Sequence, residues 1–176
     1  MENLLVSMVA TWDGHEIKMT WYPGSEIEKF NPFNQVYGVC FDSEGKILIQ
    51  NLPGQDWCLA GGTVEEGETA EATLRREIVE EADVTIKNLI LLGGQRVEYL
   101  NKDNPNKVKG NDYYQLRYYC EVDKILPQTP DPDNNQVHLR KFVSLEEINS
   151  YLNWGVVGRN IFDQATQLYR SRFGLS

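Results

Sequence analysis

The stretch from Gly61 to Val84 reads GGTVEEGETAEATLRREIVEEADV and carries eight carboxylates but only two arginines. Like charges three or four residues apart on a helix repel one another, so this density of carboxylates costs helix stability. The chain of 176 residues has a net charge of −9, and this stretch alone contributes −6 of it. The acidity is therefore local, which predicts that a positive group from outside the sequence completes the segment.

A helix is predicted to begin inside this stretch. Thr69 is a good N-cap, and Glu71 falls in the first turn, where the helix dipole favours negative charge. At about 100° per residue, one stripe of the helix is apolar; it consists of Ala70, Leu74, Ile78 and Ala82. Glu77, Glu80 and Glu81 share an arc of about 100° that overlaps the edge of that stripe. Partial burial there would increase their mutual repulsion, because a lower dielectric strengthens Coulomb interactions.

The spacing of charges and glycines separates this segment from an ordinary glutamate-rich surface helix. The pattern is Gly62, five residues, Glu68, seven residues, Arg76, Glu77, Ile78, one residue, Glu80, Glu81, one residue, Asp83 and Val84. It resembles the signature of the Nudix hydrolases. The order of elements from about residue 35 to 152 also resembles that family's domain, a mixed sheet between helices. The resemblance implies hydrolysis of the diphosphate linkage in a nucleoside diphosphate joined to a further group X.

The chemistry expected of this segment requires a divalent cation. Glu77, Glu80 and Glu81 offer hard oxygen ligands at i, i+3 and i+4, which suit Mg²⁺ or Mn²⁺. Such ions neutralise a diphosphate and lower the pKa of a bound water. Glu80 or Glu81 can also help to deprotonate that water, although the catalytic base varies across the family. The sequence thus leaves the identity of the base open.

Other residues of the motif have supporting roles by resemblance. Arg76 is expected to orient a metal-binding glutamate, and Glu68 to brace the helix or contact the metal through water; such support commonly matters to metal affinity. Gly61 and Gly62 would let the backbone approach the phosphates closely. Trp57 and Tyr99 are candidates to stack on a nucleobase, although aromatic residues in strands more often belong to the core.

The sequence departs from the family pattern at three positions. Asp83 replaces a glycine just past the helix, where a left-handed backbone is common and Asp tolerates it better than most residues. Ala60 replaces the usual proline before the paired glycines. Gln136 falls near the place where many relatives carry a further glutamate, which leaves a fourth metal ligand in doubt.

The rest of the chain predicts an α+β fold, specifically a Nudix-type α/β/α sandwich with a mixed β-sheet and an N-terminal β-hairpin extension. Alternating apolar residues and turn signals predict two hairpins, a short strand before the acidic helix, three later strands and two C-terminal helices. The hairpins cover residues 4–22 and 35–51, the short strand 56–62, the later strands 85–100, 113–122 and 137–143, and the helices 144–152 and 159–172. Ser144 and Glu147 form a capping box for the first of these helices. We place a boundary near Asn34, so that residues 1–34 form a hairpin and connector and residues 35–176 form the hydrolase domain.

Composition limits the partners. The chain has 41% hydrophobic and 24% charged residues, and its sequence shows no membrane-spanning run and no secretory signal. We therefore expect a cytoplasmic protein that does not bind membranes. The acidic balance argues against nucleic acid polymers, which need clustered Lys and Arg. Cys40, Cys58 and Cys120 are read as buried thiols. The N-terminal hairpin could serve a homodimer or cover the site.

Rival functions remain at this stage. DPDNNQ from Asp131 superficially resembles a calcium loop, but Gln136 and Phe142 stand where an EF-hand needs glycine and glutamate. No GxSxG motif supports a nucleophilic triad. The main alternative is a Nudix-fold module that binds nucleotides as a sensor without catalysis. The sequence does not identify X.

Overall fold

The computed structural model describes residues 5–12, 14–100 and 112–175. Most of the predicted loop after Tyr99, residues 101–111, and Asp13 of the predicted first turn lie outside the described residues. Within the described part, eight strands form one mixed sheet in the order β1-β2-β6-β7-β3-β4-β8, with β5 paired to β3. The contact between β3 and β7 is parallel, and the other named strand pairs are antiparallel.

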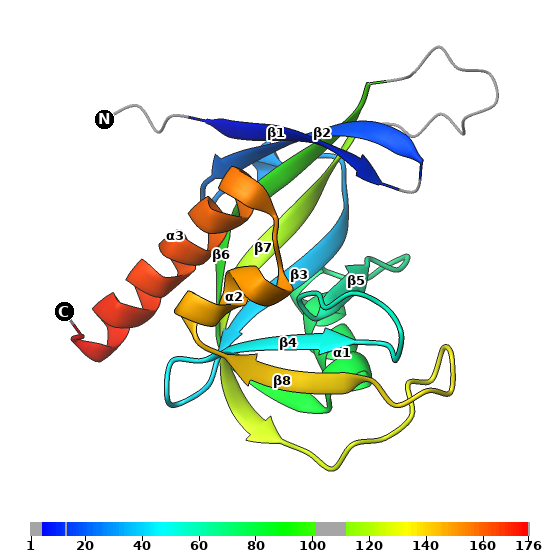
Figure 1. Ribbon diagram of the computed structural model, residues 1–176, viewed down its shortest axis with the longest axis vertical. Coiled ribbons are helices and arrows are strands. Elements are labelled where there is room, and N and C mark those ends of the chain that lie inside the picture. The colour runs from blue at the N-terminus through cyan, green and yellow to red at the C-terminus, as the bar shows by residue number, and fades with distance from the viewer. Residues whose placement is uncertain (1–4, 13, 101–111, 176) are drawn as a thin grey trace.

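The elements follow the predicted order along the chain (Figure 1). The strands are β1 Val6–Trp12, β2 His15–Pro23, β3 Phe33–Phe41, β4 Ile47–Asn51, β5 Gly61–Thr63, β6 Val84–Tyr99, β7 Tyr113–Ile125 and β8 Leu139–Val143. The helices are α1 Ala70–Ala82, α2 Leu145–Tyr151 and α3 Gly155–Phe173, with a 3-10 turn η1 at Ile27–Lys29. The predicted fold class, a sandwich of helices around a mixed sheet, is confirmed.

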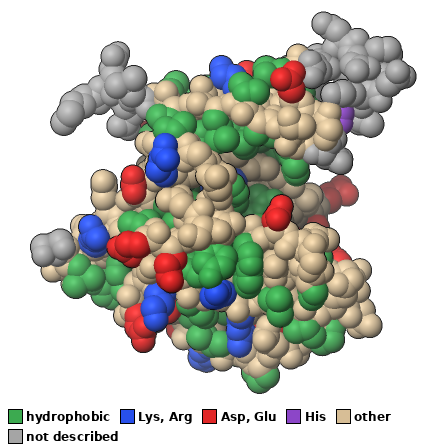
Figure 2. Space-filling view, viewed as in Figure 1, with side chains coloured by type: hydrophobic (Ala, Val, Ile, Leu, Met, Phe, Trp, Pro, Cys, Tyr) green, Lys and Arg blue, Asp and Glu red, His purple; other side chains and the backbone are tan. Residues whose placement is uncertain are grey.

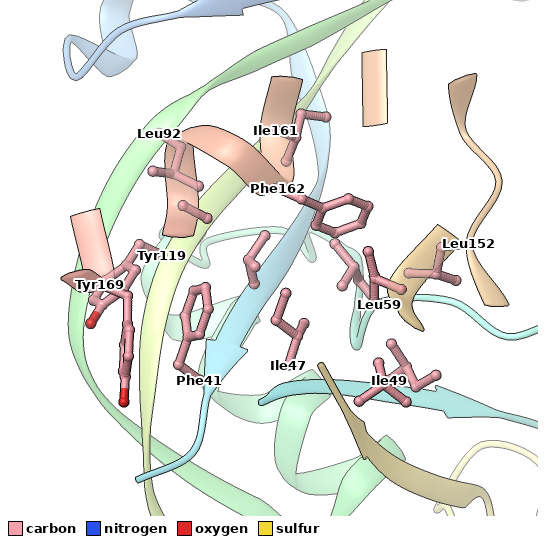
Figure 3. Packing of buried hydrophobic residues seen from close by; sticks show 14 of the residues in the cluster. Phe41, Ile47, Ile49, Leu59, Leu92, Tyr119, Leu152, Ile161, Phe162 and Tyr169 are labelled. Atoms are coloured by element: carbon pink, nitrogen blue, oxygen red, sulfur yellow. The ribbon is translucent and has the colours of Figure 1, made fainter. Parts of the chain in front are cut away.

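Two apolar clusters lie on opposite faces of the sheet. Successive residues of a strand point to opposite faces, so β3 contributes Val36 and Cys40 to the cluster under α1 and Val39 and Phe41 to the cluster under α3. Figure 3 shows the second cluster, in which Tyr169 of α3 stacks on Phe41 of β3 with ring centroids 4.8 Å apart. Full burial of each large apolar side chain stabilises the fold by roughly 1.5–3 kcal/mol. Both helices are therefore held on the sheet by their apolar stripes.

The N-terminal hairpin joins the main sheet. β1 pairs with β2 from Val6 opposite Trp21 to Trp12 opposite His15, and β2 then pairs with β6 along seven residues, from Ile17 opposite Tyr99 to Pro23 opposite Gly93. Trp21 is only 2% exposed and belongs to the cluster under α3. The hairpin thus shares the core of the larger unit, while the division into two units near Asn34 stays a prediction.

Two predicted boundaries were wrong. The strand expected over residues 56–62 is reduced to β5 and one isolated bridge, between Cys58 and Gln50, because the preceding loop turns on Pro53 and Gly54. The last helix begins at Gly155 rather than Arg159; its first turn contains glycine and valine, which have low helix propensity. Cys40 and Cys120 are buried free thiols as predicted, and Cys58 is a half-buried one.

Candidate active site

Helix α1 is fixed at both ends by side chains. Thr69 accepts a hydrogen bond from the backbone N–H of Ala72 at 3.2 Å, which confirms it as the N-cap. At the other end Asp83 adopts the left-handed conformation, with φ 51° and ψ 47°. Its carboxylate accepts from the backbone N–H of Thr129 at 3.0 Å and from the Thr129 hydroxyl at 2.6 Å. Asp83 therefore also ties the helix to the loop before β8, which a glycine could not do.

Arg76 carries the positive charge on the carboxylate face of α1, which we define as Glu77, Glu80 and Glu81. Its guanidinium donates to Glu77 at 3.0 Å and to Glu80 at 2.9 Å, and forms two bonds with Glu68, at 2.9 and 3.0 Å. The Arg76 hydrogen bonds, helped by one from the Thr73 hydroxyl, lower the pKa of Glu68 to about 2. This geometry fits the orienting and bracing roles that the motif implied for Arg76 and Glu68.

Glu81 lies deeper than the other two carboxylates of this face. It accepts a hydrogen bond from the backbone N–H of Gly61 at 2.9 Å. Burial raises its pKa to about 8, and the neighbouring charges of Glu77 and Asp131 act in the same direction. Burial also raises the pKa of Glu77. Two carboxylates are thus held where ionisation is costly, and a bound cation would lower that cost.

The paired glycines are required by close contacts. A Cβ on Gly62 would lie 2.5 Å from the carboxylate of Glu77. A Cβ on Gly61, which has φ +147°, would lie 2.2 Å from the backbone oxygen of Val36. Any side chain at either position would displace β5 from the carboxylate face. The two glycines therefore allow the backbone of β5 to lie against the carboxylate face.

The loop before β8 supplies two acidic residues that the sequence analysis did not assign to the site. Asp133 raises the pKa of Glu77, and Asp131 raises that of Glu81, so both lie within electrostatic reach of the carboxylate face. Asp131 is 7% exposed and lies 2.8 Å from His138 Nε2. Gln136 is exposed and its backbone N–H donates to Asn134 Oδ1 at 2.9 Å. The sequence analysis interpreted the DPD segment that begins at Asp131 only as a possible calcium loop. Its position just before the last strand was the sequence signal that could have assigned Asp131 and Asp133 to the site.

The described side chains include no group of three or more His, Cys, Asp or Glu residues already arranged to hold a metal ion. Arg76 bonds to Glu77 and Glu80 instead, while Glu81 bonds to Gly61. The donor set nevertheless fits Mg²⁺ or Mn²⁺, because carboxylate oxygens are the ligands that these ions prefer. Arg76 bonds to one oxygen of Glu77 and one oxygen of Glu80, which leaves the second oxygen of each carboxylate for an ion.

The two aromatic candidates have different surroundings. Trp57 is half-buried and packs edge-on against Tyr151, with ring centroids 5.8 Å apart. It adjoins Cys58, whose thiol lies within electrostatic reach of Glu81. Tyr99 lies at the far end of β6 and packs edge-on against His15 at 5.8 Å. The structure thus places Trp57 nearer the carboxylate face than Tyr99, and the stacking role of each stays a prediction.

A cavity of about 400 Å³ opens on the face of the sheet that α3 covers. It lies between the N-terminal hairpin, strands β3, β6 and β7, and the start of α3, where Figure 2 shows the surface hollowed beneath the hairpin. Tyr37 and Cys58 line it, and burial raises the pKa of both, with the charge of Glu81 acting in the same direction. The cavity therefore adjoins the carboxylate face. The volume lies near the lower end of the range for small-molecule sites.

Comparison with known proteins places the chain in a family. Residues 31–164 match the NUDIX domain, so the chain belongs to the Nudix family. A search of curated proteins found no match. None of the described helices is long and apolar enough to cross a membrane.

Solved structures share the fold. The pyrophosphohydrolase BsRppH of Bacillus subtilis has a TM-score of 0.65 and 16% identity, with 93% of this chain and 97% of that chain covered. A UDP-X diphosphatase has a TM-score of 0.56 and 19% identity over 81% and 64% of the two chains. A NUDIX hydrolase from Nitrosomonas europaea has a TM-score of 0.53 and 18% identity over 80% and 90%. At these identities the comparisons show the fold alone.

Proposed function

We propose that the chain hydrolyses the diphosphate linkage of a nucleoside diphosphate joined to a further group X, with Mg²⁺ or Mn²⁺ held by the carboxylate face of α1. Membership of the Nudix family makes it a pyrophosphohydrolase acting on phosphoanhydride bonds. The observation that carries the proposal is that Glu77 and Glu81 are partly buried with raised pKa values. Among the described residues, Arg76 is the cation that bonds to this face.

The charge of the substrate makes the need for cations explicit. A diphosphate is an anion, so it can approach three glutamates only when positive charge lies between them. Bound Mg²⁺ or Mn²⁺ would supply that charge and would lower the pKa of a water to be used in the attack. Glu77, Glu80 and Glu81 would hold the ions. Backbone N–H groups near Gly61 and Gly62 would lie close to the phosphates.

A proton acceptor is also available on this face. General bases work best when their pKa lies near the working pH. Glu81 is held in place by the N–H of Gly61, and a bound cation would lower its raised pKa so that the carboxylate is free to accept a proton. Glu80 lies one residue away and is held by Arg76. We propose that one of these two carboxylates accepts the proton of the attacking water.

The first experiment is a substrate screen. Nucleoside diphosphate sugars, dinucleoside polyphosphates and nucleoside triphosphates would be incubated with Mg²⁺, and phosphate released after phosphatase treatment would be measured. Glu80→Gln and Glu81→Gln should each lower the rate on the best substrate by about 100-fold or more, since outer-shell changes alone commonly cost 10–100-fold. Circular dichroism should show intact folds, because each change removes charge from a repulsive cluster.

Glu71→Gln is the matched control for this experiment. Glu71 is exposed in the first turn of α1 and makes no ion pair with Arg76, so its variant should keep the wild-type rate. Near wild-type rates in both Glu80→Gln and Glu81→Gln would show that the site is placed wrongly. Binding of nucleotides without metal-dependent turnover by the wild type would favour the alternative, a nucleotide sensor without catalysis.

A further inference from the structure

The cavity beneath the N-terminal hairpin contains a buried cation that has no carboxylate partner among the described residues. Arg117 of β7 lines the cavity and is 3% exposed. Burial lowers its pKa to about 10, so the guanidinium still carries its charge at neutral pH. No described acidic side chain forms an ion pair with it. Burying a charge without a partner is costly, which points to a ligand that accepts from this group.

Three of the five N–H donors of this guanidinium have partners within the described structure. Arg117 NH2 donates to Gln115 at 2.8 Å and to Gln95 at 3.2 Å, and NH1 donates to the Leu116 backbone oxygen at 3.3 Å. Nε is buried and has no described hydrogen-bond partner. A buried unsatisfied donor costs roughly 1–3 kcal/mol. Two N–H groups, the one on Nε and one on NH1, therefore lack an acceptor among the described residues.

The position of these donors is fixed by a polar ladder across the sheet. Gln35, Gln115 and Gln95 stand side by side on β3, β7 and β6, joined by hydrogen bonds of 2.6 and 3.3 Å. The guanidinium also lies over the ring of Tyr37, 4.6 Å from its centroid, and 5.7 Å from the ring of Trp154. Such cation–π contacts hold a guanidinium in place. The cavity thus presents a fixed donor rather than a mobile one.

The other walls of the cavity favour a flat and weakly polar group. Ile17, Leu59, Val97 and Val157 line it, together with Trp12 at the end of β1. A phosphate or sugar would need several polar partners, and these walls offer few. A nucleobase is planar, stacks on aromatic side chains and carries acceptors at its edge. The lining therefore matches a nucleobase better than the charged or hydroxylated parts of a nucleotide.

We propose that this cavity binds the nucleobase of the substrate and selects a base with a ring carbonyl, whose oxygen accepts from the Arg117 guanidinium. Hypoxanthine, guanine and uracil carry such an oxygen, whereas adenine carries an amino donor at the corresponding purine position. The N-terminal hairpin then forms one wall of the substrate site. This inference rests on the proposed function for the nature of the substrate, but its test does not depend on turnover.

The experiment compares two neutral nucleosides that differ at one purine substituent. Inosine and adenosine would be titrated into the full chain by calorimetry, without metal, with ribose as a control. Inosine should bind at least about tenfold more tightly, because adenosine leaves the Arg117 donor unpaired and turns an amino donor toward it. Equal affinities, or tighter binding of adenosine, would overturn the inference.

Variants test the residues named. Arg117→Gln should reduce the preference for inosine to about twofold or less, since a hydrogen bond to a charged group is lost. Arg96→Gln is the control, because Arg96 is an arginine of β6 outside the cavity. This variant should keep the wild-type preference for inosine. Unchanged selectivity in a folded Arg117→Gln protein would overturn the inference. Should Arg117→Gln fail to fold, Trp12→Ala provides the second test, since Trp12 is 48% exposed and at the sheet edge. Trp12→Ala should lower the affinity for both nucleosides several-fold. Unchanged affinities would contradict binding of the nucleobase in this cavity.

The failure of this inference can be distinguished from failure of the proposed function. Metal-dependent hydrolysis without any preference between inosine and adenosine would leave the proposed function standing and refute the base pocket. Selective binding of inosine without hydrolysis of any diphosphate would support the base pocket and refute catalysis.

Discussion

At the scale of single residues, Arg76 accounts for how the carboxylate face folds without a metal. Its guanidinium bonds to Glu68, Glu77 and Glu80, so it offsets part of the repulsion that the sequence pattern implies. Glu81 has no bond to Arg76 and keeps a raised pKa, although the Gly61 N–H and the Gln50 side chain both bond to it. Ionisation of Glu81 is therefore costly at the inner end of the face, and the expected cation would favour it there.

The link between Glu68 and Arg76 gives a prediction about acid stability. The pKa of Glu68 is lowered to about 2 in the folded protein from 4.5. A lowered carboxyl pKa contributes stability above the unfolded value, and this is lost as pH falls through the folded value. The wild type should therefore lose stability relative to Glu68→Gln between about pH 4.5 and pH 2. Urea unfolding at a series of pH values measures this; parallel pH profiles would contradict the ion pair.

At the scale of elements, much of α1 could be predicted from the sequence because its signals are local. The cap at Thr69, the apolar stripe and the left-handed residue at Asp83 all follow from residues a few positions apart. The role of Arg117 could not be predicted this way, since its partners Gln95 and Tyr37 lie on other strands. The start of α3 was missed because glycine and valine weaken its local signal.

Asp83 gives a prediction at the same scale. From the sequence, Asp83 is expected only to tolerate a left-handed backbone better than most residues, but the structure adds two hydrogen bonds to Thr129. Asp83→Gly should relieve the left-handed backbone yet lower the free energy of unfolding by about 1–3 kcal/mol, since hydrogen bonds to charged groups contribute about that much. Chemical denaturation measures the change. A more stable Asp83→Gly protein would show that backbone strain outweighs these bonds.

Thr129→Val is the control for that prediction, because it removes the hydroxyl donor while keeping a side chain of similar shape. A double-mutant cycle with Asp83→Gly should show that the two changes are not additive, as expected for groups in direct contact. Additive effects would mean that the hydroxyl bond between Thr129 and Asp83 does not contribute to stability.

At the scale of the whole molecule, the sheet brings together pieces that are far apart in the chain. β3 and β7 pair in parallel, β6 carries the hairpin, and the loop before β8 brings Asp131 and Asp133 near α1. The sequence predicts the order of strands along the chain but not these neighbours, because strand pairing depends on long-range packing. Consequently the motif was found from sequence, whereas the cavity and the two aspartates required the structure.

Metal binding should be visible in global stability. A ligand that binds only the folded state stabilises it by RT ln(1 + [L]/Kd), or about 2.7 kcal/mol at 100 times Kd. For a domain of this size each kcal/mol raises Tm by about 2–4 °C, so saturating Mg²⁺ or Mn²⁺ should raise Tm by about 5–10 °C. Differential scanning fluorimetry measures the shift. Glu77→Gln should shrink it, and equal shifts in both proteins would place the ion elsewhere.

The most direct test of the account is where the oxygen of water goes. If cations on the carboxylate face present a water to phosphorus, no enzyme nucleophile is needed and a P–O bond is broken. Hydrolysis of the best substrate in ¹⁸O-labelled water should place the label in one phosphate-containing product, detected by mass spectrometry, and EDTA should abolish turnover. Label in a product without phosphate, or turnover that resists EDTA, would contradict the proposed mechanism.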